Sequence, residues 1–298
     1  MKPMNGRFRG RLSGVHYDLS GRMPILRAGP RPADDGNPAI TLDMSGLAFA
    51  SPLELTAVAA IADAAVGHGR EVRLICPADA AVAAYVERMD LLAQFDGRAS
   101  IESRPVTGDR TDKTQVLVEL SRITSSDAAS AVGSSFGELA EAQFGPEAHK
   151  LFKCLGELLD NAATHGQSSG GGFAAAQYYT GSTSGRDGLE LAVSDNGVGV
   201  LGHLSRRYKN LATDRAALEA AVRGPVSGLS EAGRGWGLHD IVQLADAPER
   251  AALVLASGMS ALYKSQRDGR LITRLTALAA PIEGTWAWLR VRLPKRDQ

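Results

Sequence analysis

The chain has 298 residues, and its 33 Lys and Arg residues are balanced by 33 Asp and Glu residues, so the formal net charge is zero. This length accommodates two domains of ordinary size, and the neutral total argues against a protein that binds nucleic acid along its whole surface. The two cysteines are too few for a disulfide framework or a thiolate metal cluster, and no apolar run has the length of a membrane helix, so we expect a cytoplasmic protein without a membrane anchor.

The first hundred residues predict alternating strands and helices. Strands at 39–44 and 71–76 are each followed by a helix, at 53–66 and from about 79 to 89. The short connections between these elements imply that the two strands pair in parallel. Residues 1–32 also carry a net charge of plus six, because seven Lys and Arg residues face one Asp. This basic segment is either a solvated edge strand or a docking site for an acidic partner.

A polar stretch at 97–113 predicts a linker to a second module. That module alternates between apolar and helical patterns, with predicted strands at 115–120, 173–180, 189–195, 252–257, 261–265 and 286–293. Its predicted helices lie at 128–143, 146–165 and 214–222, with another beginning near residue 237. We therefore predict a mixed α/β (α+β) fold for the chain as a whole.

Two motifs in the second module combine polar side chains in a chemically useful way. Glu157 and Asn161 are four residues apart, so they share one face of a helix. Such a pair suits Mg²⁺, and the carboxylate can also deprotonate a water or hydroxyl. Asp195 ends a predicted strand, where it can accept a hydrogen bond from an exocyclic amine, and Gly197 and Gly199 then allow a sharp turn. Solvated helix residues and an ordinary turn are the structural alternatives.

A third motif follows at residues 233–237, where glycines alternate before a predicted helix. Glycines in this position expose backbone N–H groups to an anion, and the helix dipole adds a favourable potential. The spacing matches neither a Walker A loop nor a Rossmann fingerprint. The motif therefore indicates a phosphate-binding loop of another kind.

Together and in this order, the three motifs resemble those of the GHKL (Bergerat-fold) ATP-binding superfamily, and most of all its anti-sigma-factor serine kinases. The resemblance covers about residues 119–298 and implies a sandwich with helices on one face of a mixed sheet. It implies that Glu157 is the general base, that Asn161 is the Mg²⁺ ligand, and that Asp195 accepts from the adenine amine. It also implies a mobile lid at 200–232 and an ATP site completed by Gly197, Gly199, Lys209, Gly233, Arg234, Gly235, Gly237 and Thr285.

Residues 42–55, LDMSGLAFASPLEL, resemble the strand-loop-helix of STAS domains, in which a loop serine is the phosphoacceptor for a GHKL kinase. Here that position falls on Pro52, which has no hydroxyl, and Ser51 is the neighbouring alternative. We therefore expect a degenerate STAS-like domain at 1–105, a linker at 106–118 and a GHKL-like ATP-binding domain at 119–298.

These resemblances imply a bacterial regulatory protein that binds ATP and Mg²⁺ and controls a protein partner related to sigma or anti-sigma factors, with or without phosphorylating a serine. The alternative is a GHKL ATPase whose STAS-like domain serves dimerisation or targeting. A homodimer is compatible with these resemblances, and neither a membrane nor nucleic acid is expected as a partner. The chain stops about a dozen residues after Thr285, which disfavours enzymes that add a transducer domain.

Overall fold

The computed structural model of the chain describes residues 14–22, 25–27, 31–32, 38–106, 113, 115–165, 171–181, 187–224, 239, 242, 251–267 and 270–292. These residues form one largely parallel sheet, one antiparallel sheet and a small two-stranded sheet, together with helices. The prediction of a mixed α/β fold is therefore confirmed. The described helices include none long and apolar enough to cross a membrane.

The first sheet has the strand order β3-β1-β4-β6-β7. Its strands are β1 (Val15–Asp18), β3 (Arg31–Pro32), β4 (Ile40–Asp43), β6 (Val72–Ile75) and β7 (Ser100–Glu102). All neighbouring strands are parallel except β3, which runs antiparallel to β1. The predicted parallel pairing of the strands at 39–44 and 71–76 is thus confirmed. Beside it, β2 (Gly21–Arg22) and β5 (Leu47–Phe49) form the two-stranded sheet.

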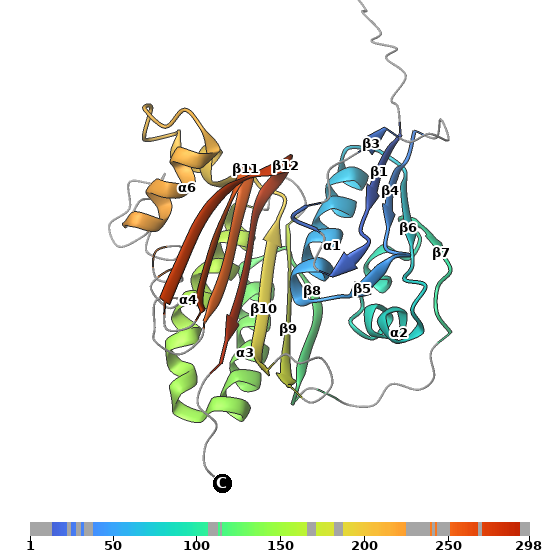
Figure 1. Cartoon of the computed structure of the whole chain (residues 1–298), viewed down its shortest axis with the longest axis horizontal. Helices are drawn as coiled ribbons and strands as arrows, with labels where there is room; N and C mark the ends of the chain where they lie inside the picture. Colours follow the sequence, from blue (N-terminus) through green and yellow to red (C-terminus); the bar gives the residue numbers. More distant parts are fainter. Residues whose placement is uncertain are drawn as a thin grey trace, which may run out of the picture.

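The second sheet is antiparallel throughout, in the order β11-β12-β10-β9-β8. Its strands are β8 (Leu117–Ile123), β9 (Gly172–Thr180), β10 (Asp187–Asp195), β11 (Ala252–Arg267) and β12 (Arg270–Val291). Helices α3 (Ser126–Phe144) and α4 (His149–His165), joined by the 3-10 turn η2 (Gly145–Ala148), cover one face of this sheet (Figure 1). Two shorter helices, α5 (Gly199–Leu204) and α6 (Asp214–Arg223), lie near its β11 edge.

Helix α1 (Pro52–Gly67) lies between the two sheets (Figure 1). It begins with Pro52 at its first position, and the Glu54 side chain accepts a hydrogen bond from the Ser51 backbone N at 3.0 Å, as in a capping box. Every residue from Pro52 to Ala60 is buried. A helix that is apolar on all sides must be covered on all sides, and its many alanines let both sheets approach closely.

The two sheets therefore share one hydrophobic core across α1. Leu53 and Val58 of α1 belong to the same buried cluster as Phe173 and Trp286 of the second sheet. The remaining elements of the first half, α2 (Ala80–Arg88) and η1 (Ala93–Phe95), also contribute to this cluster. The expected domain boundary at 106–118 stays a prediction, but the two parts meet through packed side chains.

The structure differs from the predicted elements in three places. The strands expected at 252–257 and 261–265 are one strand, β11, whose register shifts at Gly258 and so interrupts the apolar pattern. Strand β12 begins at Arg270 rather than near 286, because the apolar residues of its largely exposed first half, among them Leu271 and Ile272, do not alternate along the strand. Helix α5 lies where only a polar stretch was expected. Much of the basic segment 1–32, including residues 1–13, lies outside the described residues, as does most of the helix expected near residue 237.

Candidate functional site

Asp195, at the end of β10, organises the turn that follows it. Its carboxylate accepts a hydrogen bond from the backbone N of Gly197 at 2.7 Å and another from the backbone N of Thr285. The side chain is only 7% exposed. Two residues that the sequence placed in one adenine site, Asp195 and Thr285, thus meet in the structure although ninety residues separate them.

Two glycines make this meeting possible. Gly199 and Gly284 both have positive φ angles, 68° and 74°, a region that L-residues with side chains rarely adopt. A Cβ on Gly284 would lie 2.6 Å from Asp195 Oδ1, and one on Gly199 would lie 2.7 Å from the hydroxyl of Ser257. Neither position has room for a side chain, so the backbone approaches the carboxylate as closely as it can.

Burial makes the Asp195 carboxyl a much weaker acid than an exposed aspartate. Desolvation raises the pKa of Asp195 to about 7, although the N–H groups of Gly197 and Thr285 favour the ionised form. A carboxyl held in this way costs stability and is typical of a group kept for binding or catalysis. Near neutral pH it exists in both protonation states, so it can accept a further hydrogen bond from a ligand when it is ionised.

Helix α4 lies against the same end of the sheet. Its buried residues include Leu158, Leu159 and Ala162, and a Cβ on Gly172 would lie 3.0 Å from the Cβ of Ala162. Gly172 is paired with Asp195 across β9 and β10. The last turns of α4, which carry the half-buried Glu157 and Asn161, therefore pack beside the Asp195 turn.

The described residues bring no other predicted site residue into this group. Lys209 is exposed in the segment between α5 and α6. Gly233, Arg234, Gly235 and Gly237 lie outside the described residues. Among the described residues no three His, Cys, Asp or Glu side chains are grouped as in a metal site. A single protein ligand such as Asn161, with phosphates and water supplying the rest, would leave no such group.

Ser257 is a residue of this site that the sequence did not reveal. Its hydroxyl donates to the backbone O of Gly284 at 2.9 Å and accepts from the backbone N of Val200, also at 2.9 Å. It thereby joins β11 to the tight Gly284 segment and to the start of α5. A buried serine in an apolar strand has no distinguishing sequence pattern, so only the sheet pairing identifies it.

Asp63 of α1 forms a second buried polar group beside the site. It is 2% exposed and pairs with Arg98 at 2.6 Å and with Arg122 of β8 at 2.8 Å. It also accepts a hydrogen bond from Nδ2 of Asn196, the residue after Asp195, at 3.4 Å. One carboxylate thus connects the first half of the chain, the second sheet and the candidate site.

We expect Asp63→Ala to lower the free energy of unfolding by about 2–3 kcal/mol, because it leaves two arginines without their carboxylate, although both are partly solvated. Chemical denaturation of the variant and the parent measures the difference. Asp96→Ala is the matched control, because Asp96 pairs with Arg104 at an exposed position, where about 0.5 kcal/mol is expected. Equal effects of the two substitutions would contradict the proposed importance of Asp63.

The loop before α1 shows why Ser51 is a poor phosphoacceptor. Ser51 is fully buried and its hydroxyl donates to the Glu54 carboxylate. Pro52 occupies the first position of α1. No kinase could reach the Ser51 hydroxyl in this conformation.

A scan against protein-family models finds no match to this chain, and a search of curated proteins finds none either.

Proposed function

We propose that this protein is a regulatory ATP-binding protein of the GHKL type, whose nucleotide state controls its contact with a protein partner. The observation that carries the proposal is the buried Asp195 carboxylate, which accepts hydrogen bonds from the N–H groups of Gly197 and Thr285 and lies against Gly284, a position with no room for a side chain. An exocyclic amine such as that of adenine is the complement of such an acceptor.

The chain offers a residue for each further task in ATP binding. The amide oxygen of Asn161 would hold Mg²⁺, which would offset the negative charge of the phosphates. Glu157, one helical turn earlier on α4, would orient an attacking hydroxyl or water and take its proton. Lys209, in the segment expected to form the lid, would contribute a cation close to the phosphates.

Two features favour a protein that controls a partner rather than one that is itself phosphorylated. Ser51 is inaccessible, and position 52 is a proline. Residues of α1 also contact β10 directly, since the Ser194 hydroxyl donates to the Thr56 hydroxyl at 2.9 Å. A change in conformation at the end of β10 would therefore alter the packing of α1 and, through it, of the first sheet.

The proposal is tested by calorimetric titration of the full chain with a non-hydrolysable ATP analogue and Mg²⁺. Saturable binding of the ATP analogue with much weaker binding of the GTP analogue is expected, because guanine presents a carbonyl oxygen to Asp195 where adenine presents an amine. Labelled ATP then separates the activities. Label on a partner serine indicates a kinase, free phosphate indicates an ATPase, and binding with neither indicates a nucleotide-controlled adaptor. Absence of binding would refute the proposal.

We expect the affinity for ATP to fall at acidic pH. The ionised carboxylate is a stronger acceptor for the adenine amine than the protonated carboxyl, and the pKa of Asp195 is about 7 in the free protein. The dissociation constant should be constant above about pH 8 and should rise towards tenfold per unit below about pH 6. Titrations at saturating Mg²⁺, which keeps the phosphates ionised, measure this dependence. An affinity that does not change across this range would remove Asp195 from the adenine site.

A further inference from the structure

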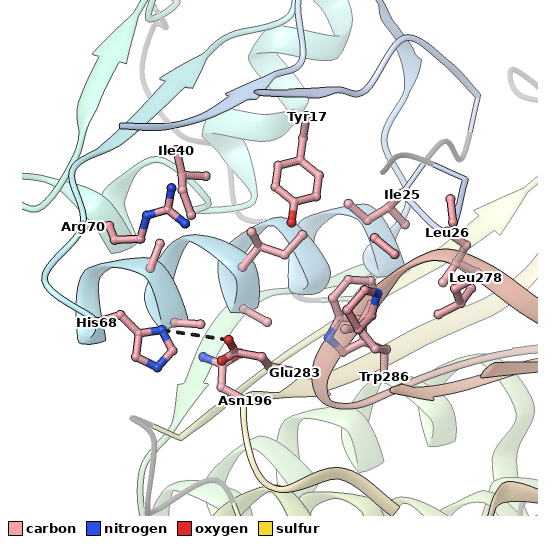
Figure 2. Close-up of a pocket in the computed structure, with 18 residues that line it drawn as sticks. Tyr17, Ile25, Leu26, Ile40, His68, Arg70, Asn196, Leu278, Glu283 and Trp286 are labelled. Atoms are coloured by element: carbon pink, nitrogen blue, oxygen red, sulfur yellow. Dashed lines mark ion pairs between the residues drawn. The ribbon is translucent and has the colours of Figure 1, made fainter. Parts of the chain in front are cut away.

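A cavity of about 150 Å³ lies between the first sheet, α1 and β12. Most of the residues in its wall are apolar, among them Ile25 and Ile40, Ile61 and Ala64 of α1, and Leu278 and Trp286 of β12. Figure 2 shows Ile25, Leu278 and Trp286 towards one end of the lining and Ile40 towards the other. The cavity is distinct from the candidate nucleotide site, although Asn196 lines its edge. An apolar cavity of roughly this volume accommodates a benzene-sized molecule.

Two buried polar groups of this cavity are hydrogen-bond donors, while Asn196 at its edge carries both a donor and an acceptor. Nε of Arg70 and Nε1 of Trp286 are both buried and have no hydrogen-bond partner among the described residues. Trp286 is 2% exposed. Leaving a buried donor unpaired costs about 1–3 kcal/mol, so these two atoms indicate that an acceptor belongs in the cavity.

Tyr17 supplies a third donor. Its hydroxyl is directed from β1 towards α1 and the cavity (Figure 2). Burial raises the pKa of Tyr17, the charge of Arg70 partly offsets that effect, and Glu283 adds to it. The hydroxyl therefore stays protonated at neutral pH and can donate a hydrogen bond.

The acidic residue of this cavity lies at its rim. The Glu283 side chain is 56% exposed, and His68, which is 63% exposed, approaches it at 3.9 Å. Charges at such exposed positions are screened by solvent. The buried side of the cavity therefore carries the positive charge of Arg70, and the exposed charges at the rim have little influence on a ligand inside. This arrangement favours an anionic ligand.

We propose that this cavity binds a small monocarboxylate with one benzene-sized apolar group, its carboxylate held by Arg70 and Tyr17 and its apolar group directed towards Leu278 and Trp286 (Figure 2). A carboxylate offers about four acceptor positions, and its ionic hydrogen bond to a guanidinium is stronger than a neutral one. The apolar group fills the space between Ile61, Ala64 and Leu278. This site does not depend on the proposed ATP function.

Calorimetric titration of the full chain with benzoate tests the proposal. Saturable binding is expected with a dissociation constant between about 10 µM and 1 mM, as suits a ligand of this size. Benzyl alcohol, which has the same ring without the charge, should bind at least tenfold more weakly, and benzylamine should show no saturable binding. No saturation by benzoate up to about 10 mM, or equal binding of the three compounds, would overturn the proposal.

Two variants locate the binding. Arg70→Gln should weaken benzoate at least tenfold, and Ala64→Leu should abolish binding by filling the cavity. Arg215→Gln is the matched control, because Arg215 is a largely exposed arginine of α6 that does not line the cavity, and it should leave the affinity unchanged. Thermal melting shows whether each variant is folded. Folded Arg70→Gln and Ala64→Leu proteins that bind benzoate as the parent does would refute the site.

Discussion

Replacing Asp195 with asparagine is expected to abolish ATP binding, with a loss of affinity of about a hundredfold or more. The substitution keeps the size of the side chain but exchanges an acceptor oxygen for an NH₂ group, which would face the adenine amine donor to donor. Sites built to hydrogen-bond a ligand group reject a mismatched group strongly. Titration with a non-hydrolysable ATP analogue measures the loss, and an unchanged affinity would refute the proposed role of Asp195.

The same substitution should stabilise the free protein above pH 7. The pKa of Asp195 is about 7 in the folded chain and near 3.8 when unfolded, so the protonated carboxyl favours folding. That contribution is complete below pH 3.8 and is lost as the pH rises through 7. Asp195→Asn removes the buried charge, and its gain at pH 8 should be roughly 2–4 kcal/mol.

Thermal or urea denaturation at pH 8 and at acidic pH measures this gain. Asp187→Asn is the control, because Asp187 lies at the other end of β10, is partly exposed and pairs with Arg292. Asp187→Asn should neither stabilise the protein nor change its affinity for ATP. A protein that loses both binding and stability in Asp195→Asn would indicate that Asp195 only holds its own turn.

Replacing Glu157 with glutamine is expected to lower turnover of ATP by about a hundredfold to a thousandfold while leaving its affinity nearly unchanged. Glutamine keeps the shape of the side chain but cannot accept the proton of an attacking water or hydroxyl. The measurement compares steady-state turnover of labelled ATP with calorimetric binding of the non-hydrolysable analogue. The expected pattern separates catalysis from binding.

Asp160→Asn provides the matched control for Glu157, since Asp160 is an exposed carboxylate on the same helix, α4. It should leave both turnover and affinity unchanged. Turnover that survives in Glu157→Gln would assign the base to another residue, and equal losses in both variants would indicate a general effect of charge on α4.

Local patterns were sufficient for much of the second sheet and its helices. Strands β9 and β10 and helices α3, α4 and α6 lie close to their predicted ranges, because apolar periodicity and turn residues act over a few neighbouring positions. The first half of β12 escaped prediction, since its exposed residues lack that periodicity and are held by pairing with β11. Local signals cannot report a strand that is stabilised mainly by its neighbour.

The sequence by itself determined that Glu157 and Asn161 share a helix face and that Asp195 is followed by a glycine turn, because four-residue spacing and backbone freedom are local properties. Only the tertiary structure decided that Gly284 and Ser257 close around Asp195, and that Asp63 links α1 to the site. Sheet pairing brings those residues together across tens of positions in the chain. Because these residues are buried between two sheets, their polar groups must form hydrogen bonds and ion pairs with one another. No spacing pattern in the sequence predicts those partners.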